Sequence, residues 1–283
     1  MALIRNSPIS VLRAGARAWR LLRRCAGAPA RGRYLILMYH DIGCGITADL
    51  FARQMNYLRT VAAVVPLDVL LEDARRGAAS GAQCAITFDD GYEGVYRDAL
   101  PCLLEHGFAA TIYLSTGFIA ESNNLAVNTG RSGLVKGRAL LSWRQVREMD
   151  GCGLRFGSHT SGHGDLSMLG RREVMEQLRC SREEISMRLG KPCDHFAYPF
   201  GRFSRQAVGL VQEAGFRTAA TTVHRALMAG DDPFRLPRAG IEDRYSMEDF
   251  KSIVRGDWDF IGLLQTLRRP RLRGATSTTP LPD

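Results

Sequence analysis

Long hydrophobic runs are absent from this sequence of 283 residues. A membrane-spanning helix needs roughly 18 or more consecutive apolar residues, and no stretch approaches that length. The composition, with 45% hydrophobic and 24% charged residues, is ordinary for a globular protein. We therefore expect no integral membrane protein, but one large domain or two small ones with a well-buried core.

Paired cysteine motifs and nucleic-acid motifs are absent as well. Seven cysteines are scattered along the chain, an odd number without a CxxC pair, which argues against a disulfide framework and against a cysteine zinc site. Unpaired cysteines of this kind are typical of a reducing compartment. The formal charge of +9 comes without any nucleic-acid-binding motif, so we predict no nucleic-acid partner.

A secretory signal is absent as well. Such a signal needs an uninterrupted apolar segment, whereas arginines interrupt the apolar residues of ISVLRAGARAWRLLRR (9–24) throughout. Arg13, Arg17, Arg20 and Arg24 fall on one helical face. This pattern is typical of a helix on an anionic membrane surface, but equally of a solvated or disordered arm. We predict a cytoplasmic protein, which the first interpretation would place peripherally at the inner face of the membrane.

Short apolar runs alternate with helix-periodic segments after a linker rich in proline, glycine and alanine at 27–32. Such alternation predicts parallel strands joined by crossover helices, and seven units favour an irregular α/β barrel over an open sheet. Residues 119–141 are polar, rich in glycine and asparagine, and expected to form an inserted loop. The expected strands are 34–39, 84–88, 111–115, 154–158, 196–199, 218–223 and 237–241. The expected helices are 47–60, 66–77, 92–106, 142–150, 166–189, 204–214 and 246–255.

This pattern divides the chain into three parts. Residues 1–33 are expected to be a basic N-terminal extension and linker, and residues 34–262 a single α/β domain. Residues 263–283 are polar and rich in proline, threonine and arginine, which is typical of a disordered tail.

Acidic and imidazole side chains gather where the predicted strands end. The 34–39 strand is followed by His40, the 84–88 strand by Asp89 and Asp90, and the 154–158 strand by His159 and then His163. The carboxyl ends of parallel strands meet on one face of such a fold, where functional sites are built. One histidine at a strand end is more often structural, but several together predict a site on this face.

The two histidines of the third cluster suit a metal. His159 and His163 are separated by Thr-Ser-Gly, a poor helix interior, so their spacing is expected to lie on a loop. Two imidazoles with one carboxylate from another strand offer three ligands on one side of a divalent metal and leave positions open. The metal charge would also offset the repulsion between Asp89 and Asp90. One aspartate would ligate the metal, and the other would take a proton from water.

The motifs TFDDG (87–91), SHTSGH (158–163) and FAYPFG (196–201), in this order on successive strand ends, resemble those of the NodB-homology polysaccharide deacetylases. The similarity extends from about Leu35 to Val254. It implies a (β/α) barrel at 34–262 that uses one divalent metal ion, zinc ahead of other first-row metals, and removes acetyl groups from N-acetylated sugars of a poly- or oligosaccharide. By this resemblance Asp89 is the catalytic base. The implied metal ligands are Asp90, His159 and His163.

The third motif carries both a match and a departure. By the resemblance, the amide of Phe200, after Pro199, helps to hold the oxyanion. Tyr198 is a candidate for stacking on a sugar ring, although an aromatic residue in such a segment is more often part of the core. The family usually has an arginine where this sequence has Ala197, and Arg238 in LPRAG (236–240) is a candidate substitute that would orient Asp89.

A second departure concerns the catalytic acid. The family's late motif, with a leucine and a histidine near the C-terminus, is missing. Instead LMYHDI (37–42) resembles the subgroup that deacetylates exopolysaccharide poly-N-acetylglucosamine, in which this histidine enters from the first strand. His40 is therefore the candidate general acid.

Two other functions stay open. A degenerate, non-catalytic glycan-binding barrel would be expected to have lost part of the ligand set, which is present in full here. The third alternative is a deacetylase of peptidoglycan or of a small amide. The unpaired cysteines and the missing signal count against peptidoglycan.

Overall fold

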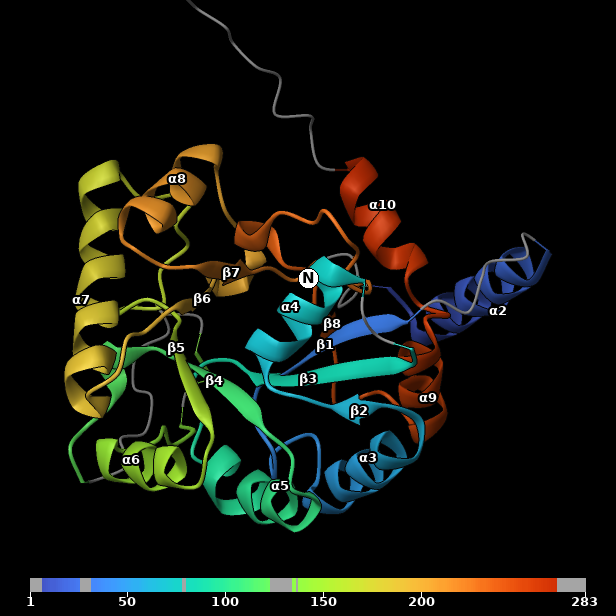
Figure 1. Ribbon diagram of the computed structural model, residues 1–283, viewed down its shortest axis with the longest axis horizontal. Helices are drawn as coiled ribbons and strands as arrows, with labels where there is room; N and C mark the ends of the chain where they lie inside the picture. The colour runs from blue at the N-terminus through green and yellow to red at the C-terminus, as the bar shows by residue number, and fades with distance from the viewer. Residues whose placement is uncertain (1–6, 26–31, 78–79, 123–133, 136, 269–283) are drawn as a thin grey trace, which may run out of the picture.

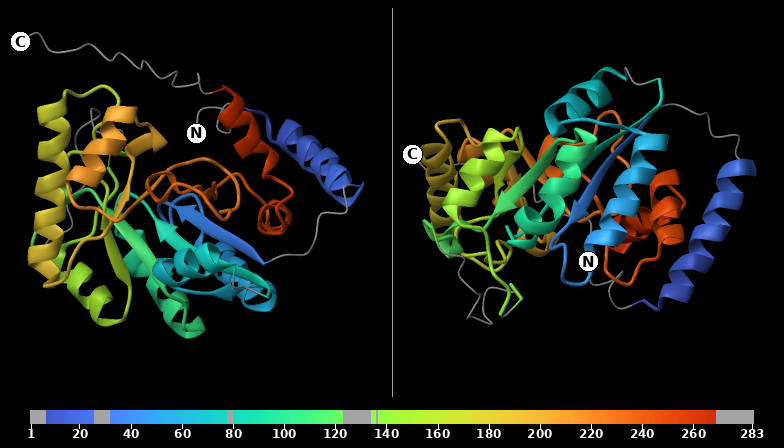
Figure 2. Two further views of the ribbon diagram at one scale, coloured as in Figure 1. Left: turned by 45° about the horizontal axis from the view of Figure 1, so that its top comes forward. Right: turned by 90° about the horizontal axis from the view of Figure 1, so that it is seen from below.

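A curled sheet of parallel strands forms the centre of the protein in the computed structural model, which describes residues 7–25, 32–77, 80–122, 134–135 and 137–268 (Figure 1). Helices lie around the outside of the sheet, as two further views show (Figure 2). The strands follow the order β7-β6-β5-β4-β3-β1-β8, and β2 pairs with β3 beside this path. All strand pairs are parallel, so the predicted irregular (β/α) barrel is confirmed.

All seven predicted strands are present, and the two-residue strand β2 was not predicted. Strand β1 is buried at six of its seven positions, as expected for a parallel strand that is covered on both faces. The strands are β1 (Arg33–Tyr39), β2 (Ala63–Val64), β3 (Ala82–Phe88), β4 (Ala110–Leu114), β5 (Arg155–Ser158), β6 (His195–Ala197), β7 (Thr218–Ala220) and β8 (Ala239–Gly240).

Each predicted helix is present, with changes at the ends. The stretch predicted from residue 166 becomes helical only at Arg171, because the N–H of Gly170 bonds to Glu173 and sets the start there. The 92–106 segment is a π-helix followed by an α-helix. The α-helices of the domain are α3 (Ala48–Val61), α4 (Leu67–Arg76), α5 (Leu100–His106), α6 (Trp143–Gly151), α7 (Arg171–Leu189), α8 (Arg205–Glu213), α9 (Met247–Arg255) and α10 (Phe260–Arg268). The short helical turns are η1 (Val95–Ala99), η2 (Thr116–Phe118), η3 (Pro199–Gly201) and η4 (Pro233–Arg235).

Strand register brings the predicted site residues to one level of the sheet. Tyr39 pairs with Phe88, and the N–H of Asp89 donates to the Tyr39 carbonyl at 2.9 Å. Two strand pairs further along, between β4 and β5, the N–H of His159 donates to the Leu114 carbonyl at 2.8 Å. The residues that follow β1, β3 and β5 therefore emerge side by side at the carboxyl end of the sheet.

The segment predicted to be a surface helix or a disordered arm forms helix α2 (Ile9–Cys25), which packs on the domain. Leu12 and Ala16 are buried, and Arg13 makes two bonds to the carboxylate of Asp249 in α9, at 2.8 and 2.7 Å. Helix α10 runs across residue 262, where the sequence predicted the domain to end. Residues 269–283 of the predicted tail, and 123–133 and 136 of the predicted insertion, lie outside the described residues.

Candidate metal and catalytic site

Four residues other than glycine have a positive φ among the described residues, and all four follow a strand end. Asp90 (φ 71°) comes after β3, and Phe200 (φ 60°) comes after β6. Thr160 (φ 68°) and His163 (φ 53°) belong to the loop after β5. A left-handed backbone costs a bulky side chain about 1–3 kcal/mol, so it persists only where surrounding contacts enforce it. Three of these four residues are ones that the sequence assigned to the site.

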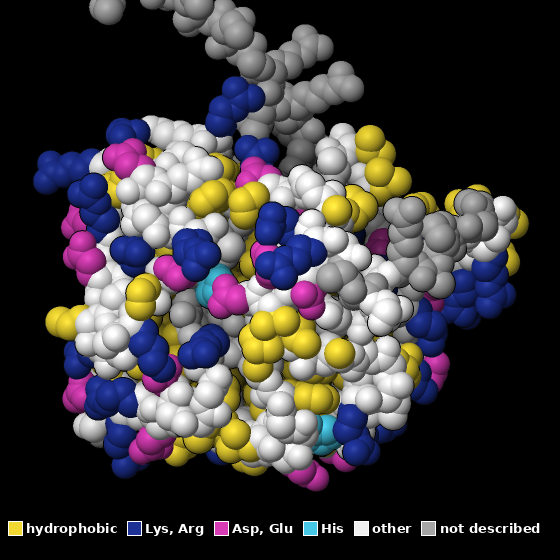
Figure 3. All heavy atoms as spheres, viewed as in Figure 1, with side chains coloured by type: hydrophobic (Ala, Val, Ile, Leu, Met, Phe, Trp, Pro, Cys, Tyr) yellow, Lys and Arg dark blue, Asp and Glu magenta, His cyan; other side chains and the backbone are white. Residues whose placement is uncertain are grey.

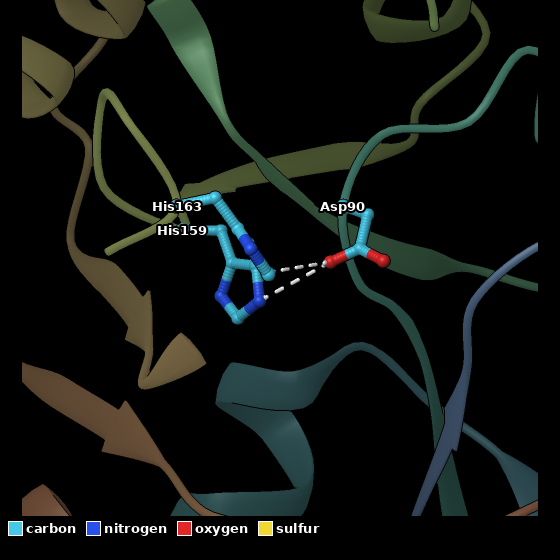
Figure 4. A group of neighbouring side chains, drawn as sticks. All are labelled: Asp90, His159 and His163. Atoms are coloured by element: carbon cyan, nitrogen blue, oxygen red, sulfur yellow. Dashed lines mark ion pairs between the residues drawn. The ribbon is translucent and has the colours of Figure 1, made fainter. Parts of the chain in front are cut away.

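The predicted metal ligands converge in the structure. Asp90 and the two histidines are buried, and one ligand atom from each lies within 4.8 Å of the others (Figure 4). Oδ1 of Asp90 is 3.4 Å from Nε2 of His159 and 3.1 Å from Nε2 of His163. The ring of Phe200 packs edge-on against His163, with 4.9 Å between the ring centroids. The loops after β3, β5 and β6 therefore build one compact cluster.

The hydrogen bonding of His159 indicates what the cluster binds. Nδ1 of His159 lies 2.7 Å from the carbonyl oxygen of Ala197, which can only accept, so Nδ1 carries the hydrogen. Nε2 of the neutral ring then directs a lone pair toward the Asp90 carboxylate. Two electron-rich atoms in this arrangement repel each other unless a proton or a cation lies between them. The donor set therefore fits a divalent cation such as zinc, with the Ala197 carbonyl fixing one ligand ring.

Asp89 has a different partner. Both of its carboxylate oxygens accept from Arg238, at 2.6 and 2.7 Å, and the Arg238 side chain is fully buried. Arg238 is itself held by the carbonyl of Thr221 at 3.0 Å and the hydroxyl of Thr87 at 3.2 Å. The structure thus has the Asp89–Arg238 contact that was predicted to compensate for Ala197.

The electrostatic surroundings of Asp89 and Arg238 favour the charged form of both side chains. Burial works to raise the pKa of Asp89, but the charge of Arg238 and the neighbouring imidazoles outweigh it, so the pKa lies below the usual value. Burial also works to lower the pKa of Arg238, and the attraction of Asp89 outweighs it and raises this pKa. Asp89 is therefore an ionised carboxylate whose orientation is fixed by a bidentate bond.

A pocket of about 390 Å³ opens over these residues. Its lining includes six of the predicted site residues: His40, Asp89, Asp90, His159, His163 and Phe200. The other two predicted residues, Tyr198 and Pro199, are buried and do not line it. The Tyr198 hydroxyl donates to the carbonyl of Phe234 at 3.1 Å, and its ring packs against Phe196 and Phe203. This packing favours the core interpretation of Tyr198 over sugar stacking.

The pocket also contains charged residues to which the sequence analysis gave no role. Asp41 pairs with Arg138 at 3.2 Å, and burial raises the pKa of Asp41 to about 6 against the pull of that guanidinium. Glu242, Asp243 and Arg244, just after β8, line the pocket as well. The sequence did contain a sign that Asp41 belongs to the site, since it directly follows His40 at a strand end. It contained no such sign for Arg138, because this residue belongs to the predicted insertion.

Comparisons with known proteins agree with this geometry. The family model for polysaccharide deacetylase matches residues 76–219, just over half of the chain. The poly-beta-1,6-N-acetyl-D-glucosamine N-deacetylase of Staphylococcus aureus (strain MRSA252) is 22% identical over 224 residues, which cover 76% of this chain and 72% of that protein.

Two solved structures share the fold. IcaB from Ammonifex degensii has a TM-score of 0.66 and 24% identity, covering 80% of this chain and 97% of that one. The Streptococcus pyogenes deacetylase PplD in complex with acetate has a TM-score of 0.66 and 22% identity, covering 78% and 98%. The predicted resemblance and enzyme class are confirmed: the chain belongs to the polysaccharide deacetylase family of NodB-homology hydrolases.

Proposed function

We propose that this protein hydrolyses the acetamido group of N-acetylated sugars in a poly- or oligosaccharide, with one divalent metal ion as cofactor. The observation that carries the proposal is the convergence of Asp90, His159 and His163 beside an ionised carboxylate, Asp89, in a pocket that also holds His40. A ligand cluster next to a separate, oriented base is what a hydrolase needs.

In this proposal Asp90, His159 and His163 hold the metal, and zinc suits this ligand set best. When bound, such a cation would act as a Lewis acid and would lower the pKa of water toward roughly 7. The bond from His159 to the Ala197 carbonyl keeps its Nε2 free of hydrogen and directed at the cluster.

Asp89 is the general base. Its carboxylate is ionised and keeps lone pairs beyond the two bonds to Arg238, so it accepts the proton of the attacking water. Arg238 acts through Asp89 as a positioning residue. A fixed carboxylate loses no further conformational freedom when the reaction begins, which lowers the barrier.

His40 is the general acid and Phe200 supports the oxyanion. His40 lines the pocket and is close enough to Asp89 and Asp90 to contribute to lowering the pKa of both. In its protonated form it donates to the nitrogen that leaves as the amine. The backbone N–H of Phe200 donates to the oxygen that becomes negative as water adds to the acetyl carbonyl.

The substrate class follows from two observations taken together. The histidine of LMYHDI enters from the first strand, and a relative with 72% of its length covered is named as a poly-beta-1,6-N-acetyl-D-glucosamine N-deacetylase. We propose an N-acetylglucosamine polymer as substrate. We also propose residues 34–262 as the catalytic domain, since every pocket residue named here lies within it. The cytoplasmic location stays a prediction that cell fractionation tests.

Acetate release from a panel of substrates tests the function. The panel contains β-1,6-linked and β-1,4-linked N-acetylglucosamine oligomers, a peptidoglycan fragment and a small N-acetyl amide, each with chelator and then with added metal. We expect release from the β-1,6-linked oligomers that chelation abolishes and metal restores. Binding of the oligomers without acetate release under every condition would favour the non-catalytic barrel instead.

A further inference from the structure

Helices α2 and α10 form a corner of the molecule with a large share of exposed apolar side chains. The two helices contact each other (Figure 2). Gly15 of α2 lies so close to Phe260 of α10 that a Cβ atom at Gly15 would come within 2.6 Å of the ring. Among the described residues, no helix is long and apolar enough to cross a membrane. The exposed apolar residues of this corner, here called the α2–α10 surface, are Val11, Leu21, Leu22, Leu263, Leu264 and Leu267.

Helical spacing joins these side chains into one surface. Val11 and Leu22 are four residues before and seven after Gly15, on the same side of α2. On α10, Leu263, Leu264 and Leu267 follow Phe260 by three, four and seven residues, so they share the side of Phe260. Because Gly15 touches Phe260, the exposed leucines of both helices flank the same contact. Hydrophobic side chains are visible on both helices in the space-filling view (Figure 3).

The charged side chains of helices α2 and α10 themselves have one sign. Neither α2 nor α10 contains an aspartate or glutamate. Arg13 and Arg20 are occupied by the carboxylates of Asp249 and Asp257, at 2.7 and 2.5 Å. The arginine face that the sequence suggested for a membrane is therefore used in part to dock α2 on its own domain.

Two other arginines remain available. Arg17 and Arg24 are exposed and make no ion pair within the part of the chain that the structure describes. They lie on the helix that supplies Val11, Leu21 and Leu22. An exposed apolar face bordered by unpaired arginines, on a helix without acidic residues of its own, is the pattern of a helix that lies in the plane of a membrane interface.

We propose that the α2–α10 surface docks on an anionic phospholipid bilayer, with its leucines in the interface and Arg17 and Arg24 at the headgroups. The N-terminal end of α2 lies next to the pocket, because Arg244, which lines the pocket, donates to the carbonyl of Ser7 just before α2. This proposal does not depend on the reaction that the pocket performs.

Vesicle sedimentation with the full chain tests the proposal. The chain should bind vesicles that contain phosphatidylglycerol, bind phosphatidylcholine vesicles far less, and lose binding as salt shortens the reach of the charges. The double variant Arg17→Glu/Arg24→Glu should weaken binding by about tenfold or more. Leu22→Ser/Leu267→Ser should weaken it by about tenfold as well. Point variants are preferable to deleting α2, since deletion would leave the buried Asp249 and Asp257 without their arginines.

Two matched variants serve as controls. Arg53→Glu/Arg59→Glu makes the same charge change on exposed positions of α3, and Met168→Ser/Met187→Ser removes two exposed apolar side chains elsewhere. Both should bind like the parent. Equal losses in the controls, or a parent chain that ignores anionic vesicles at low salt, would overturn the proposal. The proposal would also be overturned if the parent chain formed a dimer that does not bind vesicles and if the leucine variants dissociated this dimer. The surface would then join two copies of the chain.

Discussion

The pocket and the α2–α10 corner both rely on arginine–aspartate pairs, but they bury them to different extents. In the pocket, the Arg238 side chain is fully buried and that of Asp89 is 3% exposed. At the corner, Arg13 is 44% exposed although its partner Asp249 is 5% exposed. Water can therefore solvate the arginine at the corner but not the arginine in the pocket. The same residue pair therefore fixes the carboxylate proposed as the base in one place and attaches a helix in the other.

Backbone strain divides the two regions in the same way. The four residues other than glycine with positive φ in the described chain all lie in loops at the pocket, and the corner has none. The pocket thus concentrates both buried charge and strained backbone, which persist only in a rigid surrounding. We expect single substitutions to have large effects in the pocket and small ones at the corner.

The largest of the four effects is expected for His40, the proposed general acid. His40→Ala should lower kcat and kcat/KM together by about 10²–10⁴-fold, because a group that protonates only the leaving amine acts in the transition state. Bound metal should stay unchanged. His106→Ala, at the end of α5 and outside the pocket, is the control and should retain parental rates. A soluble, metal-loaded His40→Ala protein within a few-fold of the parent would remove His40 from this role.

The buried Arg238–Asp89 pair should have a large effect on the free energy of unfolding. Arg238→Met leaves Asp89 buried without its countercharge, which should cost about 3–5 kcal/mol in the free energy of unfolding. The control Arg225→Met breaks a pair whose side chains are 22% and 15% exposed, and should cost about 1 kcal/mol or less. Urea denaturation measures both. Similar losses for the two variants would contradict the expectation that the fully buried pair contributes more to stability than the partly exposed one.

A buried histidine beside the corner should make stability depend on pH. His224 is buried with no hydrogen bond to either ring nitrogen among the described residues, and it supports α10 through a bond from Gly262 to its carbonyl. Burial lowers the pKa of His224 to about 4, against the attraction of Asp259. Between pH 6.5 and 4, His224 therefore binds a proton in the unfolded chain but not in the folded chain.

The free energy of unfolding should consequently fall as pH drops through this window, by up to roughly 3 kcal/mol from this group alone. His224→Leu should flatten that part of the stability curve. Denaturation at a series of pH values measures the slopes. Parallel curves for the parent and His224→Leu would show that the folded state does not disfavour this protonation.

The smallest effect is expected for the exposed arginines of the corner. Arg17→Glu should change the free energy of unfolding by no more than about 0.5 kcal/mol, since Arg17 makes no ion pair among the described residues. The same urea titration measures it. A loss as large as that of Arg238→Met would mean that Arg17 has a structural partner.

Site residues that follow a strand end were predictable from the sequence, whereas contacts between residues far apart in the chain were harder to predict. Asp90, His159 and His163 were predictable because each directly follows or lies close behind a short apolar strand, and parallel strands end on one face. Arg238 was named only as a replacement for a missing family residue, since it lies 149 positions from Asp89.

The docking of α2 was less predictable still. Arg13 and Asp249 are 236 residues apart, so an arginine-rich amphipathic helix offered no sign of which charges its own domain would neutralise. Helix α10 was missed because its short apolar segment follows the last predicted helix without a clear start signal. The docking of α2 and the presence of α10 therefore depend on tertiary packing, which the local sequence does not reveal.

Metal content measured together with acetate release tests the central claim, that Asp90 and the two histidines hold the metal while Asp89 serves as base. We expect His163→Ala to lose most bound zinc by elemental analysis and nearly all activity. Asp89→Asn, which keeps the shape of the side chain, should retain the zinc and lose turnover. A His163→Ala protein with its full metal content, or an Asp89→Asn protein that loses the metal, would contradict this division of roles.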